Sequence, residues 1–312
     1  MNFSRVNTGD DLALATIMKW ILFTLLTLLI CRSGYCQSEE IRVMSYNILT
    51  GFDWGKDSSR EASLVSWVKD QNADVIALQE LCDFNQQKLE LLAKKWNHNY
   101  AVILKEGGYP VGLTSNKPIE LMERVLEGLW HGMLHCKTWG IDFYVVHLSP
   151  ADWQFRKEET GIIAERIVRG SVSNDKYIVL GDFNAHSPFD GDFDIKYPYQ
   201  LERARRGDLK NEKYKNLRNG LFDYSVMASF LSLPLTDVCQ RFVSLDDRTT
   251  CPTPINVPEW LTREEMQKTK SRIDYILVSP TLEQFCTGAY IFNGEPTQYL
   301  SDHYPIVADF RL

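Results

Sequence analysis

The sequence predicts a mixed α/β fold whose sheet is mixed or antiparallel rather than all parallel. Short apolar runs alternate along the chain with amphipathic stretches, as strands interleaved with helices do. Two runs, 131–138 and 141–148, flank Trp139-Gly140 and are typical of a β-hairpin. Hydrophobic residues make up 44% of the 312 residues and charged residues 24%, which excludes a disordered or collagen-like chain.

The individual elements follow from the spacing of apolar residues. Alternating or continuous apolar runs indicate strands, and apolar residues near helical spacing indicate helices. The sequence predicts strands over 41–46, 75–78, 177–180, 272–278 and 305–311, in addition to the hairpin, and helices over 60–71, 84–96 and 152–169. Neither an internal repeat nor a long linker interrupts this region, so we expect one domain over residues 37–312.

The N-terminal region has the features of a processing signal. Met18-Lys19 precedes an apolar and Thr-containing run over 20–30, which is shorter than the roughly 20 residues that a membrane span needs. We therefore expect residues 1–36 to comprise a signal peptide and an upstream extension, with translation starting at Met18. The mature chain would be exported, secreted or periplasmic, without a stable membrane span. An uncleaved membrane anchor is the alternative.

The charge and cysteine content limit the possible partners. A net charge of -7 provides no overall positive field for nucleic acid or an anionic membrane, although a bound divalent cation can reverse the local sign. The cysteines beyond residue 36 show no zinc-site spacing. Among them, Cys239 and Cys251 are close enough in sequence to suggest a local disulfide.

Polar side chains follow or precede the predicted strands at six places. Because rigid strands fix the position of the loops that follow them, enzymes commonly gather functional side chains at strand ends. The residues at these places are Asn47, Glu80, His147, Asp182 with Asn184, Asp274, and Asp302 with His303. One such residue would be explained by a turn, a cap or a buried histidine. Their repeated placement favours a shared cleft.

The chemistry of this set points to phosphate-ester hydrolysis. Its carboxylates and carboxamides offer oxygen donors, which suit Mg²⁺ or Mn²⁺ rather than zinc. His147 and His303 could act as a general base and as a stabiliser of an oxyanion, and Asp274 could orient one of them. A hard metal ion and an oriented base together describe metal-assisted hydrolysis of a phosphate ester.

The ordered set of motifs resembles the endonuclease/exonuclease/phosphatase superfamily, which has the deoxyribonuclease-I-like fold. The resemblance spans about residues 41 to 312 and implies a four-layer α/β sandwich of two mainly antiparallel sheets flanked by helices. The active site would lie at one edge. The motifs that carry the resemblance are Tyr46-Asn47, the run from Asp74 to Glu80, Val146-His147-Leu148, Gly181-Asp182-Phe183-Asn184, Arg272-Ile273-Asp274-Tyr275-Ile276 and Ser301-Asp302-His303-Tyr304-Pro305.

The resemblance also implies a role for the metal-site and base residues. Glu80 resembles the family's principal Mg²⁺ ligand, with Asn47 beside it, and Asp302 resembles a further metal-site carboxylate. His303 resembles the general base that activates water, and Asp274 resembles its orienting partner.

Three further residues resemble the phosphate-handling part of the family's site. Asp182 and Asn184 resemble the pair that positions the nucleophile and the scissile phosphate. His147 resembles a second histidine of the deoxyribonuclease and sphingomyelinase branches, which binds the phosphate or assists the leaving group. The sequence identifies no carboxylate partner for His147, and this histidine argues mildly against a role in repair at abasic sites.

We therefore expect a secreted, Mg²⁺-dependent (or Mn²⁺-dependent) phosphoesterase that cleaves phosphodiesters by in-line attack of water. The expected substrate is nucleic acid or a small phosphodiester, and the expected state is a monomer. The alternatives are a phosphoesterase of the same fold acting on phospholipid head groups or sugar phosphates, and a catalytically inactive binding module.

A basic run within the segment 186–235 has two interpretations, which differ in the substrate that they imply. This run could track phosphates along a nucleic acid, or it could be the solvated face of a helix, which is the more ordinary explanation. Its members are Arg203, Arg205, Arg206, Lys210, Lys213, Lys215 and Arg218.

Overall fold

The computed structural model describes Lys19, Trp20 and residues 39–312 of the chain. Apart from Lys19 and Trp20, the predicted signal peptide and its upstream extension lie outside the described residues. Within the described part, no helix has both the length and the apolar character that crossing a membrane requires. Residues Glu40–Leu312 form one compact unit.

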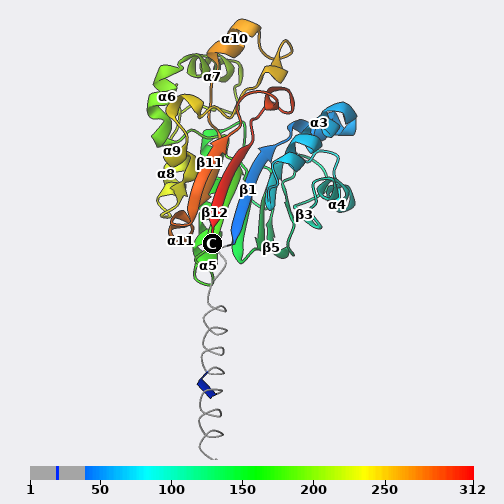
Figure 1. Ribbon diagram of the computed structural model, residues 1–312. Coiled ribbons are helices and arrows are strands. Elements are labelled where there is room, and N and C mark those ends of the chain that lie inside the picture. The colour runs from blue at the N-terminus through cyan, green and yellow to red at the C-terminus, as the bar shows by residue number, and fades with distance from the viewer. Residues whose placement is uncertain (1–18, 21–38) are drawn as a thin grey trace, which may run out of the picture. The chain divides into compact units, whose positions relative to one another are not determined.

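Two six-stranded sheets form the centre of this unit (Figure 1). The first sheet has the strand order β11-β12-β1-β2-β4-β3 and the second has the order β5-β6-β7-β8-β10-β9. The strands of the first sheet are β1 (Glu40–Asn47), β2 (Val75–Gln79), β3 (Tyr100–Ile103), β4 (Gly112–Ser115), β11 (Cys286–Ile291) and β12 (Ile306–Arg311). Those of the second are β5 (Glu120–Val125), β6 (Met133–Thr138), β7 (Ile141–His147), β8 (Tyr177–Asp182), β9 (Thr236–Asp237) and β10 (Asp274–Val278).

Each sheet contains one parallel pair of strands, and the other paired strands run antiparallel. The parallel pairs are β1 with β2 in the first sheet and β7 with β8 in the second. Parallel strands end at the same edge of a sheet. Asn47 and Gln79 are therefore partners at one edge, and His147 and Asp182 are partners at another. Both sheets are mixed and mainly antiparallel, as the sequence predicts.

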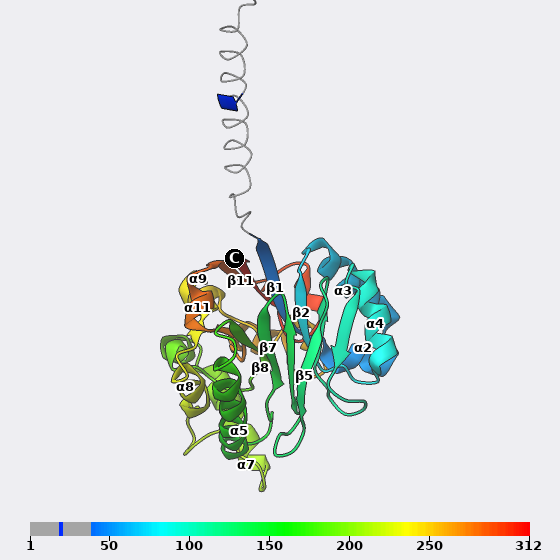
Figure 2. The same ribbon diagram turned by 90° about the horizontal axis from the view of Figure 1, so that it is seen from below.

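Helices cover the outer face of each sheet. The helices are α2 (Leu49–Gly55), α3 (Ser58–Asp70), α4 (Gln86–Lys95), α5 (Trp153–Ser171), α6 (Gly191–Lys196), α7 (Tyr199–Lys210), α8 (Ser225–Leu231), α9 (Val238–Phe242), α10 (Arg263–Lys268) and α11 (Pro280–Glu283). Figure 2 shows α3 and α4 on one side of the strands, with α5 and α8 on the other. The result is the four-layer sandwich that the resemblance implies.

The alternation of side chains along each strand explains these layers. In β1, Ile41 and Val43 point into the core between the two sheets, whereas Met44 and Tyr46 pack against α3 and α4. The second sheet behaves in the same way, since its outward residues such as Val179 pack against α5 and α8. Three apolar clusters thus hold four layers together.

Local sequence signals fix the ends of several elements. The hairpin of β6 and β7 turns at Trp139 and Gly140, whose φ angles of 56° and 72° match a two-residue turn. Asp57 and Asp152 cap α3 and α5, because each side chain accepts a hydrogen bond from a backbone N–H of the first turn.

The segment α2 is a turn of left-handed rather than right-handed helix. Residues 50–54 have φ angles between 47° and 64°, although only Gly51 among them lacks a side chain. Such a conformation costs roughly 1–2 kcal/mol per non-glycine residue. Gly51 is required here, since a Cβ atom would lie 2.1 Å from the Cys82 carbonyl oxygen.

The disulfide suggested by the sequence is wrong. Cys239 and Cys251 are both free, as are Cys82, Cys136 and Cys286. Cys239 lies in the core between the two sheets, whereas Cys251 lies next to His303. Closeness in sequence did not bring the two sulfur atoms together, because the chain between them turns through separate short elements.

Candidate active site

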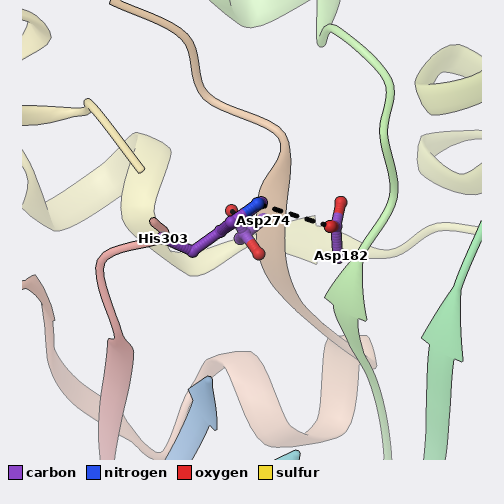
Figure 3. Close-up of side chains that lie close together, drawn as sticks. All are labelled: Asp182, Asp274 and His303. Carbon is purple, nitrogen blue, oxygen red and sulfur yellow. Dashed lines mark hydrogen bonds and ion pairs between the residues drawn. The ribbon is translucent and has the colours of Figure 1, made fainter. Parts of the chain in front are cut away.

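Three buried side chains from three different strand ends meet at one edge of the sandwich (Figure 3). Asp182 ends β8, Asp274 begins β10, and the two residues are partners in the antiparallel pairing of these strands. His303 lies just before β12, in the other sheet. Donor atoms of the three side chains lie within 4.8 Å of one another. The fold therefore assembles this group from segments far apart in the sequence.

His303 and Asp274 form a hydrogen-bonded pair. The Nδ1 atom of His303 lies 2.8 Å from Oδ2 of Asp274, and both residues are buried. Burial lowers the pKa of His303, but the charges of Asp274, then of Cys251 and Asp182, outweigh it and raise the pKa well above its ordinary value. A carboxylate at Nδ1 places the proton there and leaves Nε2 as the atom that can accept another.

Asp182 occupies the centre of the group. Burial, followed by the charge of Asp274, raises the pKa of Asp182 to about 8. Its Oδ2 lies 3.8 Å from Nε2 of His303, and its Oδ1 accepts a hydrogen bond from the backbone N–H of Asn184 at 2.9 Å. The preceding Gly181 makes this position possible, because a Cβ atom there would lie 2.0 Å from the Val146 carbonyl oxygen.

Asn47 connects Asp182 to Glu80. Its Nδ2 lies 3.2 Å from Oε1 of Glu80 and 3.2 Å from Oδ2 of Asp182. Glu80 also accepts a hydrogen bond from the Thr50 backbone N–H at 2.7 Å, at the start of the left-handed turn. Burial and then the charge of Asp302 raise the pKa of Glu80. The carboxylates of Glu80 and Asp302 thus repel each other at partly buried positions.

Asp302 is connected to the same network through Ser301. The Ser301 hydroxyl donates to the Asn47 carbonyl oxygen at 2.6 Å and lies 3.4 Å from Oδ1 of Asp302. All the site residues predicted from the sequence are therefore linked to one another in space.

His147 reaches the site from the end of β7. Its Nε2 lies 3.5 Å from Oδ2 of Asp182, which is the carboxylate partner that the sequence does not identify. Burial lowers the pKa of His147 well below its ordinary value, and the neighbouring His131 and His303 lower it further. Its Nδ1 is buried without a hydrogen-bond partner among the described residues. The lowered pKa favours the neutral imidazole form of His147.

Sequence reasoning missed His131. Its ring stacks on His147, with ring centroids 4.2 Å apart, and also contacts Tyr109 at 5.4 Å. His131 stands at the start of an apolar run, a position that carries no chemical signal by itself. Only the pairing of β6 with β7 brings the two histidines together.

The donor set fits a hard divalent cation. The carboxylates Glu80 and Asp182 both have raised pKa values, so a positive charge is favoured between them and Asp302. Oxygen donors of this kind suit Mg²⁺ or Mn²⁺. Asn47 does not present its oxygen to the carboxylates. Its Oδ1 accepts a hydrogen bond from the Leu49 backbone N–H, and its amide nitrogen faces Glu80 and Asp182.

Comparison with known proteins places this site in a family. A model of the Endonuclease/Exonuclease/phosphatase family matches residues 44–303, which include all the site residues described above. This chain belongs to that family. The match to the family confirms the resemblance stated from the motifs. No curated protein matches the chain in sequence.

Solved structures of similar fold agree with the family. An AP endonuclease from Archaeoglobus fulgidus has a TM-score of 0.63 and 17% identity, over 87% of this chain and 100% of the other. The 3'-5' exonuclease NExo from Neisseria meningitidis has a TM-score of 0.62 and 18% identity, over the same shares of the two chains. Truncated TDP2 from Caenorhabditis elegans has a TM-score of 0.57 and 16% identity, over 88% and 98%. At these identities the likeness establishes the fold.

Proposed function

We propose that this family member is an exported, divalent-metal-dependent phosphodiesterase that uses His303 to activate water. The observation that carries the proposal is the His303–Asp274 pair, 2.8 Å apart and buried beside the carboxylates Asp182 and Glu80. Active sites are where burial and neighbouring charges shift pKa values strongly, and this edge of the sandwich contains several such groups.

His303 and Asp274 supply the base in this mechanism. Asp274 accepts the Nδ1 proton, which leaves Nε2 of His303 to take a proton from the attacking water. The Asp274 carboxylate then stabilises the imidazolium that forms. A divalent cation held by Glu80 and Asp302, with Asn47 beside it, would when bound neutralise the phosphate and offset the carboxylates around His303.

His147 and Asn184 are placed to bind the phosphate. A neutral His147 has one ring N–H, and its Nε2 lies 3.5 Å from Oδ2 of Asp182, beyond ordinary hydrogen-bond distance, so an N–H on Nε2 remains for a phosphate oxygen. The Asn184 side chain donates one amide hydrogen to the Leu148 carbonyl at 3.0 Å, so its second hydrogen remains for a phosphate oxygen. Both donors would stabilise the charge that develops on the phosphate in the transition state.

The proposal includes export, a monomeric state, and a nucleic acid or small phosphodiester as substrate. Export is supported by the apolar run after Met18-Lys19. A nucleic acid is supported by a related fold, the 3' phosphatase NExo from Neisseria, whose structure contains a product DNA hairpin. A phosphoesterase acting on phospholipid head groups or sugar phosphates uses the same chemistry and is the second candidate. The complete set of acid, amide and histidine side chains argues against an inactive binding module.

The test is hydrolysis of bis(p-nitrophenyl) phosphate by the purified protein. We expect activity with Mg²⁺ or Mn²⁺, its loss in EDTA, and its recovery when the metal is restored. His135 forms a similar buried pair with Asp142, at 2.7 Å, and provides a matched control. His303→Ala should lower turnover by about 10² to 10⁴-fold, while His135→Ala retains it. Full activity in EDTA would contradict the metal-dependent mechanism, and inactivity under every metal would favour the binding module.

A further inference from the structure

A cavity of about 350 Å³ lies directly beside the proposed phosphate-binding residues. Asn184 lines it on one side, together with Ile273, which precedes Asp274, and Cys251, which lies next to His303. This volume is at the lower end of the range that small-molecule sites occupy. The cavity therefore has room for more than a phosphate group and shares its wall with the site.

One face of α7 forms the opposite wall. Gln200, Arg203, Ala204 and Gly207 all line the cavity, and their spacing of three, four and seven residues puts them on one side of the helix. Ala204 and Gly207 leave space, whereas Gln200 and Arg203 supply polar groups. The segment that carries the basic run thus contributes to the lining of the cavity.

The lining is cationic although the chain is acidic. It contains Arg156 and Arg203 but no Asp or Glu, in a chain with a net charge of -7. The Arg156 guanidinium is engaged, since its Nη1 donates to the Ser149 carbonyl and to Asn216, each at 2.9 Å. Arg203 makes neither a hydrogen bond nor an ion pair within residues 39–312. An unpaired guanidinium in such a cavity favours an anion.

The neighbouring arginines of the same basic run, Arg205 and Arg206, have hydrogen-bond partners. Nε of Arg205 donates to the Gly220 carbonyl at 2.8 Å, and Nη2 of Arg206 donates to the Tyr199 hydroxyl at 3.2 Å. Both residues are exposed and neither lines the cavity. Arg203 is therefore distinguished from them by its position on the helix.

Two other features of the lining suit a nucleotide. Oε1 of Gln200 is buried without a hydrogen-bond partner among the described residues, so it can accept from an N–H or O–H group. His186 and Phe222 stack with ring centroids 3.7 Å apart and offer a flat aromatic wall. A ligand that carries an anion, a hydrogen-bond donor and a ring would satisfy all three features.

We propose that this cavity binds the nucleotide next to the scissile phosphodiester, with the second phosphate of that nucleotide on Arg203. The inference rests on the proposed phosphodiesterase function and narrows its substrate to one with at least two phosphates linked through a nucleoside. Gln200 accepts a hydrogen bond from the nucleoside, and the ring of the nucleoside lies against the His186–Phe222 wall.

The experiment compares two pairs of substrates, and the members of each pair have the same scissile bond. They are thymidine 5'-(p-nitrophenyl phosphate) with and without a 3'-phosphate, together with the isomeric 3'-ester with and without a 5'-phosphate. In the wild type we expect the added phosphate to increase kcat/KM about tenfold or more in one of the two series, since hydrogen bonds to charged groups are among the strong ones. Arg203→Gln should bring the ratio close to one. The matched control Arg205→Gln should keep the wild-type ratio.

A second variant tests the cavity without changing its charge. Gly207 lines the cavity, a Cβ atom added there would have no neighbouring atom within 4 Å, and the backbone is right-handed helix, so Gly207→Leu adds bulk at the lining without a clash at Cβ. We expect it to lower kcat/KM for the nucleotide substrates relative to bis(p-nitrophenyl) phosphate. Thermal unfolding of each variant checks that it is folded.

The outcomes separate the two proposals. If the wild type hydrolyses the esters but gains nothing from the added phosphate, or if Arg203→Gln and Arg205→Gln have the same ratio, the nucleotide cavity is wrong. If the wild type hydrolyses none of them, the proposed function is wrong. Calorimetry with thymidine 3',5'-bisphosphate then still tests the cavity, since binding that Arg203→Gln removes would support it and no binding would overturn it.

Discussion

His131 stacks on His147 with an interplanar angle of 26° and a centroid separation of 4.2 Å. Both rings are buried. Burial and then the charge of Lys105 lower the pKa of His131 to about 4, so two neutral imidazoles are in contact near pH 7. From this stacking we expect His131 to act as a positioning residue that holds the ring of His147 beside Asp182.

We expect His131→Ala to lower kcat about tenfold to a hundredfold while KM changes little, because a small misplacement of a catalytic group is costly. His131→Phe restores a stacked ring and should recover most of the activity. Steady-state kinetics on bis(p-nitrophenyl) phosphate measure both variants. If His131→Phe loses as much as His131→Ala, the imidazole itself is required and the positioning role is wrong.

The His303–Asp274 pair predicts a non-additive loss. His303→Ala should lower kcat by about 10² to 10⁴-fold, the usual contribution of general-base catalysis. Asp274→Asn should lose as much or less, and the double variant should resemble the worse single variant, because the two residues act as one unit. Kinetic constants for the three variants check this. Losses that multiply independently would contradict the pair.

Metal binding is expected to strengthen as the pH rises. The pKa of Asp182 is raised to about 8, so below that pH this carboxylate, which neighbours the proposed ligand Glu80 through Asn47, is protonated and adds no negative charge to attract a cation. The apparent affinity for Mn²⁺ should therefore rise by up to about tenfold per pH unit below pH 8 and then level off. Calorimetric titration with Mn²⁺ at pH 6.5 and 8.5 measures it. Asp182→Asn should flatten the pH dependence, and an equally steep dependence in that variant would exclude this carboxylate as its source.

Glu159 predicts how stability depends on pH. It is fully buried, its two carboxylate oxygens accept hydrogen bonds from the Trp130 and Ser149 backbone N–H groups at 2.8 Å, and burial raises its pKa to about 7. The folded state therefore holds the proton more tightly than the unfolded state does. The stability from this group is fully present below about pH 4.5 and is lost as the pH rises through 7.

As the pH rises from below 4.5 to above 7, the free energy of unfolding should fall by roughly 3 kcal/mol. Urea unfolding at pH 5 and pH 8 measures it, and Glu159→Gln should reduce the difference between the two conditions. An unchanged difference in that variant would assign the pH dependence to other groups.

The left-handed turn gives a prediction for stability. Gly51→Ala should lower the free energy of unfolding by about 3 kcal/mol, because its Cβ atom would lie 2.1 Å from the Cys82 carbonyl oxygen. Gly107 also has a positive φ, 78°, but no atom lies within 4 Å of its Cβ position. Gly107→Ala should therefore cost only about 1 kcal/mol. Equal costs would show that the contact with Cys82 relaxes.

Elements with a strong local pattern are those that the sequence predicts correctly. The predicted helix over 152–169 is α5, and the predicted strand over 75–78 lies within β2. The short strands β3, β4 and β9 are not predicted, since their hydrogen-bond partners come from distant segments and their own residues show little periodicity. The left-handed turn after Asn47 is not predicted either, because Thr50, Phe52 and Trp54 in it are residue types that rarely adopt positive φ.

The site also contains residues that the sequence predicts and residues that it does not. Residues such as Glu80 and Asp182 can be predicted because polar side chains directly follow apolar runs. His131 and the cavity beside α7 cannot, since their places depend on strand pairing and on which face of a helix turns inward. The basic run illustrates this, because a sequence does not distinguish the cavity-lining Arg203 from the exposed Arg205 before the helix is placed.

The two sheets each contribute half of the site. Asn47 ends a strand of the first sheet and His303 lies just before another, whereas Asp182 and Asp274 belong to the second sheet, so the contacts of 3.2 Å and 2.8 Å connect the two halves. Neither sheet alone supplies both members of the His303–Asp274 pair. Turnover therefore depends on the alignment of the two halves, and a cavity made in the core between the sheets, as by Phe143→Ala, should impair catalysis at a distance while each sheet keeps its own hydrogen bonds.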